Sequence, residues 1–175
     1  WVPKEWEVDS IRDRIEITYG KSQVEVRDSE GNVPVYGTGG LMEFANTSLF
    51  DKDSILIGRK GTLDKPFFIK SPFWVVDTAY YVSDFKDGDI NFLAHLFSRF
   101  DFRKLNESTG VPSLNRETIY REKLAFPPVK EQIVISKRIN ALIMALDENK
   151  KYLEKLKKQK KGLMQDLLTG KVRVV

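Results

Sequence analysis

Apolar residues recur at alternating spacings of four and three positions along the C-terminal part of the sequence. Eight of the ten positions are apolar, and the series comprises Ile135, Ile139, Leu142, Leu146, Asn149, Leu153, Leu156, Lys160, Leu163 and Leu167. This spacing, sustained over several heptads, is typical of a coiled-coil seam. Pro127-Pro128 suits the start of a helix, and Gly170 suits the position after its end. The pattern predicts one long helix over residues 131–168.

The length of this helix indicates that it needs a partner. Residues 131–168 would span about 57 Å at the rise of an α-helix, whereas a compact domain of the preceding size is only about 35 Å across. We therefore expect the helix to extend beyond its own domain and to pair with a second helix along the seam. The polar seam residues Asn149 and Lys160 would then fix the register of the pair, although they could instead mark a poorly packed stretch.

The preceding residues alternate in shorter patterns that predict a mixed domain. Short strands are expected at residues 7–8, 16–18, 23–26, 54–58, 65–69, 73–76 and 78–82. The segment Gly58-Arg59-Lys60-Gly61-Thr62 separates two of them, which indicates a hairpin with a basic, glycine-bounded tip. Asp89 is expected to cap a helix that follows it. The predicted fold class is α+β, with a globular domain over residues 1–128 and a long coiled-coil helix in residues 129–175.

Composition narrows the chemistry further. The 175 residues are 41% hydrophobic and 11% aromatic, which is enough to bury a core. The sequence has no cysteine and one histidine, His95. This excludes disulfides, thiol catalysis and histidine-rich or thiolate metal sites. There is no apolar run of about 20 residues to span a membrane, and the first residues do not resemble a signal peptide. We expect a cytoplasmic protein.

The positive charge is concentrated at the C-terminal end. Residues 147–175 hold nine Lys or Arg and four Asp or Glu, a net of +5, whereas residues 1–146 have a net charge of −1. Such a tail could bind nucleic acid. A solvated helix face is the interpretation that we favour.

None of the sequence motifs indicates an enzyme. The glycine-rich segment 37–40 lacks the lysine and the helix of a phosphate-binding loop. Phe126-Pro127-Pro128-Val129 lacks both the polar and the aromatic residue of the motif found in amino-group methyltransferases. Glu148-Asn149-Lys150 lies on the predicted helix and is better explained as surface charge. His95 has no neighbouring nucleophile and is best explained as a structural residue. We expect no catalytic residue, no metal and no cofactor.

Three loops have the side chains that nucleic-acid binding requires. Residues 36–40 could present backbone amides, and the tip at 59–62 places two cations where they could approach a phosphate. Residues 104–116 are rich in Asn, Ser, Thr and Arg, which read base edges. Each loop could also be an ordinary solvated turn. The predicted DNA contacts are Lys21, Tyr36, Gly37, Thr38, Gly39, Gly40, Arg59, Lys60, Gly61, Thr62, Lys104, Ser113, Asn115 and Arg116.

An ordered series of motifs resembles a known family. It comprises Val2–Val8 with its Pro-x-x-Trp, the Pro-x-Tyr-Gly-Thr-Gly-Gly stretch at 34–40, Ile57-Gly58-Arg59-Lys60-Gly61, the aromatic-Asp-Thr segment at 73–78, Phe126–Gln132 and Gly162–Arg173. On these residues, the chain resembles the specificity subunit of type I restriction–modification enzymes. The resemblance covers nearly all of the chain.

The resemblance implies a non-catalytic reader of double-stranded DNA. Members of the family carry two target recognition domains, each of which grips one half of a split target, and two helices that set the gap. Methyltransferase and restriction (motor-nuclease) subunits assemble on this scaffold. This chain holds one such domain and one helix, so we expect a half-length subunit or half of a longer one; the end of the sequence resembles a natural C-terminus. A half-length subunit would form a homodimer through antiparallel helices and read a palindromic split target.

Two other functions remain open at this point. The chain could be the recognition part of a fused restriction–methylation enzyme. It could also be a dimeric scaffold that binds no DNA.

Overall fold

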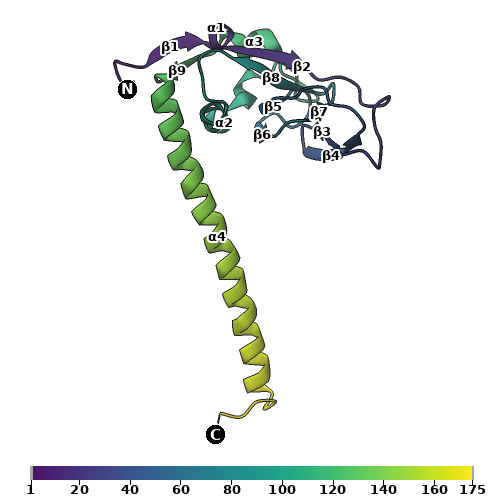
Figure 1. The fold of residues 1–175 in the computed structure, drawn as a ribbon, viewed down its shortest axis with the longest axis vertical. Coiled ribbons are helices and arrows are strands. Elements are labelled where there is room, and N and C mark those ends of the chain that lie inside the picture. The colour runs from purple at the N-terminus through teal and green to yellow at the C-terminus, as the bar shows by residue number, and fades with distance from the viewer. Residues whose placement is uncertain (1, 175) are drawn as a thin grey trace. The chain divides into compact units, whose positions relative to one another are not determined.

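The computed structural model describes residues 2–174, shown in Figure 1. The chain divides into two compact units between Ser136 and Lys137. The first unit holds the strands and the short helices. The second holds most of the long C-terminal helix and the residues that follow it.

The elements follow one another in a mixed order. They are β1 (Glu7–Ser10), α1 (Ile11–Arg14), β2 (Ile15–Tyr19), β3 (Val33–Gly37), β4 (Gly40–Ala45), β5 (Ser54–Gly58), β6 (Phe67–Ile69), β7 (Trp74–Val75), β8 (Ala79–Phe85), α2 (Ile90–Arg99), the 3-10 helix η1 (Phe102–Leu105), α3 (Arg116–Arg121), β9 (Lys123–Phe126) and α4 (Val129–Leu168). The strands form a four-stranded sheet in the order β2-β8-β5-β6, a three-stranded sheet in the order β4-β3-β7, and the pair β1-β9.

The two central strands of the larger sheet separate two hydrophobic clusters. In β5, Ile55 and Ile57 join one cluster while Leu56 joins the other. In β8, Tyr80 and Val82 face the first cluster while Tyr81 faces the second. This alternation follows from the two-residue period of a strand, and it explains why residues 55–57 of β5 and 79–82 of β8 are all apolar or aromatic.

The two clusters are covered by different elements. Apolar side chains from α2, η1 and α3 fill the first cluster, and they include Phe92, Leu93, Phe97, Phe102, Leu105, Ile119 and Tyr120. The second cluster adjoins the smaller sheet, whose own buried residues are Val33, Val35, Ala45, Trp74 and Val76. Figure 1 shows the larger sheet between α2 and the strands β3 and β4.

The first turns of α4 are bonded to the rest of the first unit through buried polar groups. The Gln132 side chain donates to the Pro127 carbonyl at 2.8 Å and accepts from the Asp89 backbone amide at 3.0 Å. The Ser136 hydroxyl donates to the Asp89 carboxylate, which also accepts from the Asn91 amide and so caps α2. Ile135, the first residue of the predicted seam, packs against the first cluster.

The structure confirms the α+β class, the long helix and the helix cap at Asp89. Residues 54–58 and 67–69 pair antiparallel as predicted. The strand predicted at residues 23–26 is wrong, because this segment forms a turn in which the Gln23 carbonyl accepts from both Val26 and Arg27. None of the helices within residues 2–174 combines the length and the apolar character needed to cross a membrane.

Candidate nucleic-acid interface

Two of the predicted contact loops are joined by main-chain hydrogen bonds. The loop after β5 contains Arg59 and Gly61, and it lies beside the segment that leads into α3. The Gly61 amide donates to the Pro112 carbonyl, and the Leu114 amide donates to the Arg59 carbonyl, both at 2.9 Å. Lys60 and Ser113 form an antiparallel bridge between these bonds. Segments that are more than 50 residues apart in the sequence therefore form one surface.

The third loop adjoins this surface. It is the tight turn between β3 and β4, in which Gly37 pairs with Gly40, and Gly40 has a φ of +115°. The Cα of Gly61 faces this turn, since a Cβ at Gly61 would lie 4.0 Å from the Thr38 hydroxyl oxygen. We use the name loop cluster for residues 36–40, 59–62 and 104–116 together.

Glycine at position 58 allows the basic tip to fold back on itself. A Cβ at Gly58 would lie only 1.9 Å from the Thr62 carbonyl oxygen, so only glycine fits there. The amides of Arg59 and Lys60 both donate to the Thr78 carbonyl at 3.0 Å, which fixes the backbone between the glycines. The tip is therefore a rigid loop that presents two cations.

The Arg59 side chain lies on an exposed tyrosine that is not among the contacts predicted from the sequence. Its guanidinium carbon is 5.2 Å from the centre of the Tyr19 ring, and its Nη1 donates to the Asp77 carbonyl at 3.0 Å. Tyr19 ends β2 and is 41% exposed. The only sequence signal was an aromatic residue at a strand end directly before Gly20-Lys21, and this signal is weak.

Two predicted contacts near α3 are engaged in holding the fold. The Asn115 carboxamide oxygen accepts from the Glu117 amide at 2.9 Å and caps α3. The Arg116 guanidinium lies 5.1 Å from the Tyr19 ring centre, and its Nη1 donates to the Ile17 carbonyl at 3.2 Å. The Nε atom of Arg116 is buried without a hydrogen-bond partner.

The other predicted contacts lie around this group. Tyr36 is partly buried, and its ring meets Phe67 edge-on with the centres 6.0 Å apart. Lys60, Thr62, Lys104 and Lys21 have exposed side chains. The main chain of Lys21 is fixed, because its amide donates to Val75 and its carbonyl accepts from the Trp74 indole.

The electrostatics of the cluster favour an anionic partner. None of the ion pairs within residues 2–174 involves Arg59 or Arg116, so no carboxylate neutralises either guanidinium. Burial, reinforced by a hydrogen bond with Tyr19, raises the pKa of Tyr80 to about 12, so this neighbouring phenol stays neutral. Its hydroxyl donates to the Leu114 carbonyl at 2.9 Å and ties β8 to the loop cluster.

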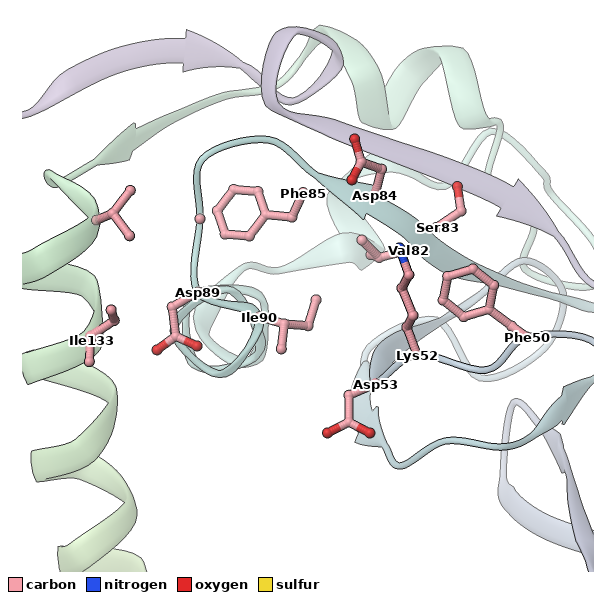
Figure 2. A pocket seen from close by; sticks show the side chains of 12 residues that line it. Phe50, Lys52, Asp53, Val82, Ser83, Asp84, Phe85, Asp89, Ile90 and Ile133 are labelled. Carbon is pink, nitrogen blue, oxygen red and sulfur yellow. The ribbon is translucent and has the colours of Figure 1, made fainter.

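A separate depression of about 380 Å³ lies at the other end of the sheet. Figure 2 shows Phe85, Ile90 and Ile133 around it, together with Lys52 and Asp53. It adjoins the Phe85 end of β8, whereas the loop cluster adjoins the Ala79 end of the same strand. Residues 2–174 contain no group of three or more His, Asp or Glu side chains that could hold a metal ion.

Comparison with known proteins gives the family of the chain. Residues 3–158 match the model of the type I restriction modification DNA specificity domain. The chain belongs to this family. The matched residues include the whole loop cluster and the seam as far as Leu156, so the resemblance predicted from the sequence motifs is confirmed.

Relatives in sequence and in structure agree with this assignment. The MjaVIII specificity subunit of a type I restriction enzyme from Methanocaldococcus jannaschii is 24% identical over 96% of this chain and 43% of its own length. The S subunit of a type I restriction–modification system from M. genitalium has a TM-score of 0.69 at 14% identity, over 92% of this chain and 45% of that one. A chain from a structure of the type I R-M system, solved for its complex assembly and conformational transition, has a TM-score of 0.76 at 12% identity, covering 94% and 45%. The chain thus spans less than half the length of each of these proteins.

Proposed function

We propose that this chain is a sequence-reading part of a type I restriction–modification specificity subunit, and that it binds double-stranded DNA without catalysis of its own. The observation that carries the proposal is the convergence of three loops, distant in sequence, at one end of the sheet. The cluster contains two arginines that form no ion pair with a carboxylate, and the exposed tip beside them carries Lys60, which suits an anionic partner such as DNA. We also propose a cytoplasmic location, because the protein would bind the DNA of the cell.

The two cations at the tip have different proposed roles. Lys60 is exposed beside Gly61 and can approach a phosphate closely, so we assign it to the DNA backbone. The Arg59 guanidinium lies over the Tyr19 ring, and its Nη1 donates to the Asp77 carbonyl, which leaves further N–H donors for other acceptors. A guanidinium held in this way suits a bidentate contact to guanine.

We propose that the chain assembles through its long helix, α4. Six seam leucines in the second unit are at least 41% exposed: Leu142, Leu146, Leu153, Leu156, Leu163 and Leu167. Their exposure supports antiparallel pairing with a second copy or with an equivalent helix of a longer chain. Each recognition domain of the pair would read one half of a split target, and methyltransferase and restriction subunits would assemble on this scaffold.

Selection from randomised duplexes tests the proposed function. The full chain is incubated with duplexes that carry a random region, and the bound fraction is sequenced. We expect an enriched motif. Failure to enrich any sequence, with no duplex binding even at low salt, would contradict the proposal and favour a scaffold that binds no DNA.

Variants then locate the contact. Arg59→Ala should cost about 1–3 kcal/mol of binding and relax the preference at one position. Lys60→Ala should weaken binding to all sequences and lower the salt slope by about one unit. The matched control replaces the exposed helix residues Lys151, Lys155 and Lys158 with Gln, which should leave DNA affinity nearly unchanged. If the control loses binding while the tip variants bind normally, the assignment is reversed.

A further inference from the structure

Arginine and tyrosine side chains alternate in an unbroken row that leads to the loop cluster. The Arg12 guanidinium carbon lies 4.7 Å from the ring centre of Tyr120, and that of Arg116 lies 5.7 Å from the same ring. Arg116 is also 5.1 Å from the ring of Tyr19, and Arg59 is 5.2 Å from it. We call Arg12, Tyr120, Arg116, Tyr19 and Arg59, in this order, the arginine–tyrosine ladder.

The inner end of the ladder is fixed by the fold. Tyr120 is 7% exposed, and its hydroxyl accepts from the Ile17 amide at 2.8 Å and donates to the Ile17 carbonyl at 3.3 Å. Arg12 forms an ion pair with Glu117. The inner positions therefore have hydrogen-bond or charge partners in β2 and α3.

The outer end has no such charge partner. Arg116 is held by the two rings and the Ile17 carbonyl, and its buried Nε makes no hydrogen bond. The Tyr19 ring meets Tyr80 edge-on with the centres 4.9 Å apart, which fixes its plane. Arg59 rests on this ring and on the Asp77 carbonyl. The Arg59 side chain is thus held by these two contacts before any partner binds.

We propose that Tyr19 and Arg116 are positioning residues that orient the Arg59 guanidinium for a planar, two-acceptor group of DNA. This inference rests on the proposed function. The Arg59 guanidinium lies over the Tyr19 ring and gives one donor, at Nη1, to the Asp77 carbonyl, which leaves other N–H donors for a partner. An arginine that is already ordered loses less side-chain entropy on binding, so affinity and selectivity both gain. The acceptor pair belongs either to a guanine edge or to a phosphate, and these two sources respond differently to salt and to sequence.

Ring removal at Tyr19 is the central experiment. The probe is the duplex enriched by the wild-type chain, compared with a scrambled duplex of the same composition. Tyr19→Phe keeps the ring and should bind within about twofold of wild type, whereas Tyr19→Leu should weaken binding about two- to fivefold. Relaxed preference at one base would assign Arg59 to guanine; uniform weakening with a smaller salt slope would assign it to phosphate. Equal binding by Tyr19→Leu and wild type would overturn the inference.

A double-mutant cycle separates positioning from direct contact. In an Arg59→Ala background, Tyr19→Leu should cause no further loss, because its effect passes through Arg59. If the two losses multiply instead, Tyr19 contacts DNA itself and the positioning role is wrong. Tyr152→Leu, at an exposed tyrosine of the second unit, is the matched control and should bind as wild type.

Arg116→Lys gives a second test that keeps the charge. A lysine cannot stack as a planar group on two rings, so this variant should lose affinity to a similar extent and should also lose selectivity. Full retention of both by Arg116→Lys would show that charge alone matters, which overturns the role of the ladder. If the wild-type chain enriches no sequence, the proposed function fails and this inference fails with it. If the wild-type chain binds DNA and the Tyr19 and Arg116 variants bind equally well, the inference is refuted but the proposed function is not.

Discussion

Replacing Gln132 with Leu should destabilise the first unit substantially. The side chain is 1% exposed and uses both ends of its carboxamide, donating to the Pro127 carbonyl at 2.8 Å and accepting from the Asp89 amide at 3.0 Å. Leucine is close in size but has no polar atom. The substitution therefore leaves one backbone donor and one backbone acceptor without their partners.

The structure sets the magnitude of the effect. Each unsatisfied buried group costs about 1–3 kcal/mol. Pro127 is buried, so its carbonyl bears the full cost, while Asp89 is only partly buried and its amide bears less. We expect a loss of about 2–4 kcal/mol in the free energy of unfolding. Glu131→Ala, at the exposed neighbouring position, should change it by less than about 0.5 kcal/mol.

Urea unfolding followed by tryptophan fluorescence measures this loss, because all three tryptophans lie within the first 74 residues. The free energy of unfolding should fall with urea concentration with the same slope in both variants as in wild type. Enrichment of DNA sequences by folded Gln132→Leu should match wild type, since Gln132 lies away from the loop cluster. A loss below about 1 kcal/mol would refute the reasoning that these two hydrogen bonds hold the start of α4.

Three further outcomes follow from single features. Gly58→Ala should destabilise the first unit and abolish selective DNA binding, because its Cβ would collide with the Thr62 carbonyl. Urea unfolding measures the loss of stability, and selection from randomised duplexes measures the loss of selective binding. Burial raises the pKa of Tyr80 from 10.0 to about 12, so the unfolded chain ionises first, and stability should fall by about 2 kcal/mol as pH rises through this window. Tyr80→Phe should show a smaller fall in the same alkaline unfolding series. Leu146→Asp combined with Leu153→Asp should dissociate any dimer, because charges on a buried seam lose hydration. Sedimentation measures the dissociation. A dimer of unchanged stability would contradict pairing along the seam.

The long helix was predictable because its signal is local and repeated. Each position of the heptad series contributes the same information, so the helix over Val129–Leu168 is predicted despite single polar residues such as Asn149. The cap at Asp89 was predictable for the same reason, since the side chain acts on an amide two residues away. Ile135 shows the limit of this logic, because its packing against the first cluster depends on tertiary structure.

Short strands and the site depend on contacts that the local sequence does not encode. The alternating residues 23–26 have the pattern of a strand, but no neighbouring strand pairs with them and Val24 is exposed. The predicted loops could be found individually by composition. Their convergence depends on long-range pairing such as Lys60 with Ser113. Tyr19 could not be selected, because its proposed role rests on contacts with two arginines 40 and 97 positions away.

The distribution of charge within the fold explains why net charge is a poor guide to the interface. The tail holds the positive excess, yet Lys150, Lys157 and Lys171 each form an ion pair with a carboxylate of the same unit. The first 146 residues have a net charge of −1, yet the charges of Arg59 and Arg116 converge on one aromatic ring without a carboxylate. Counterion release and base recognition both depend on charges that are grouped at the contact. A nearly neutral domain can therefore be the DNA reader that we propose, and the positive excess of the long helix is no argument against its proposed role as a spacer.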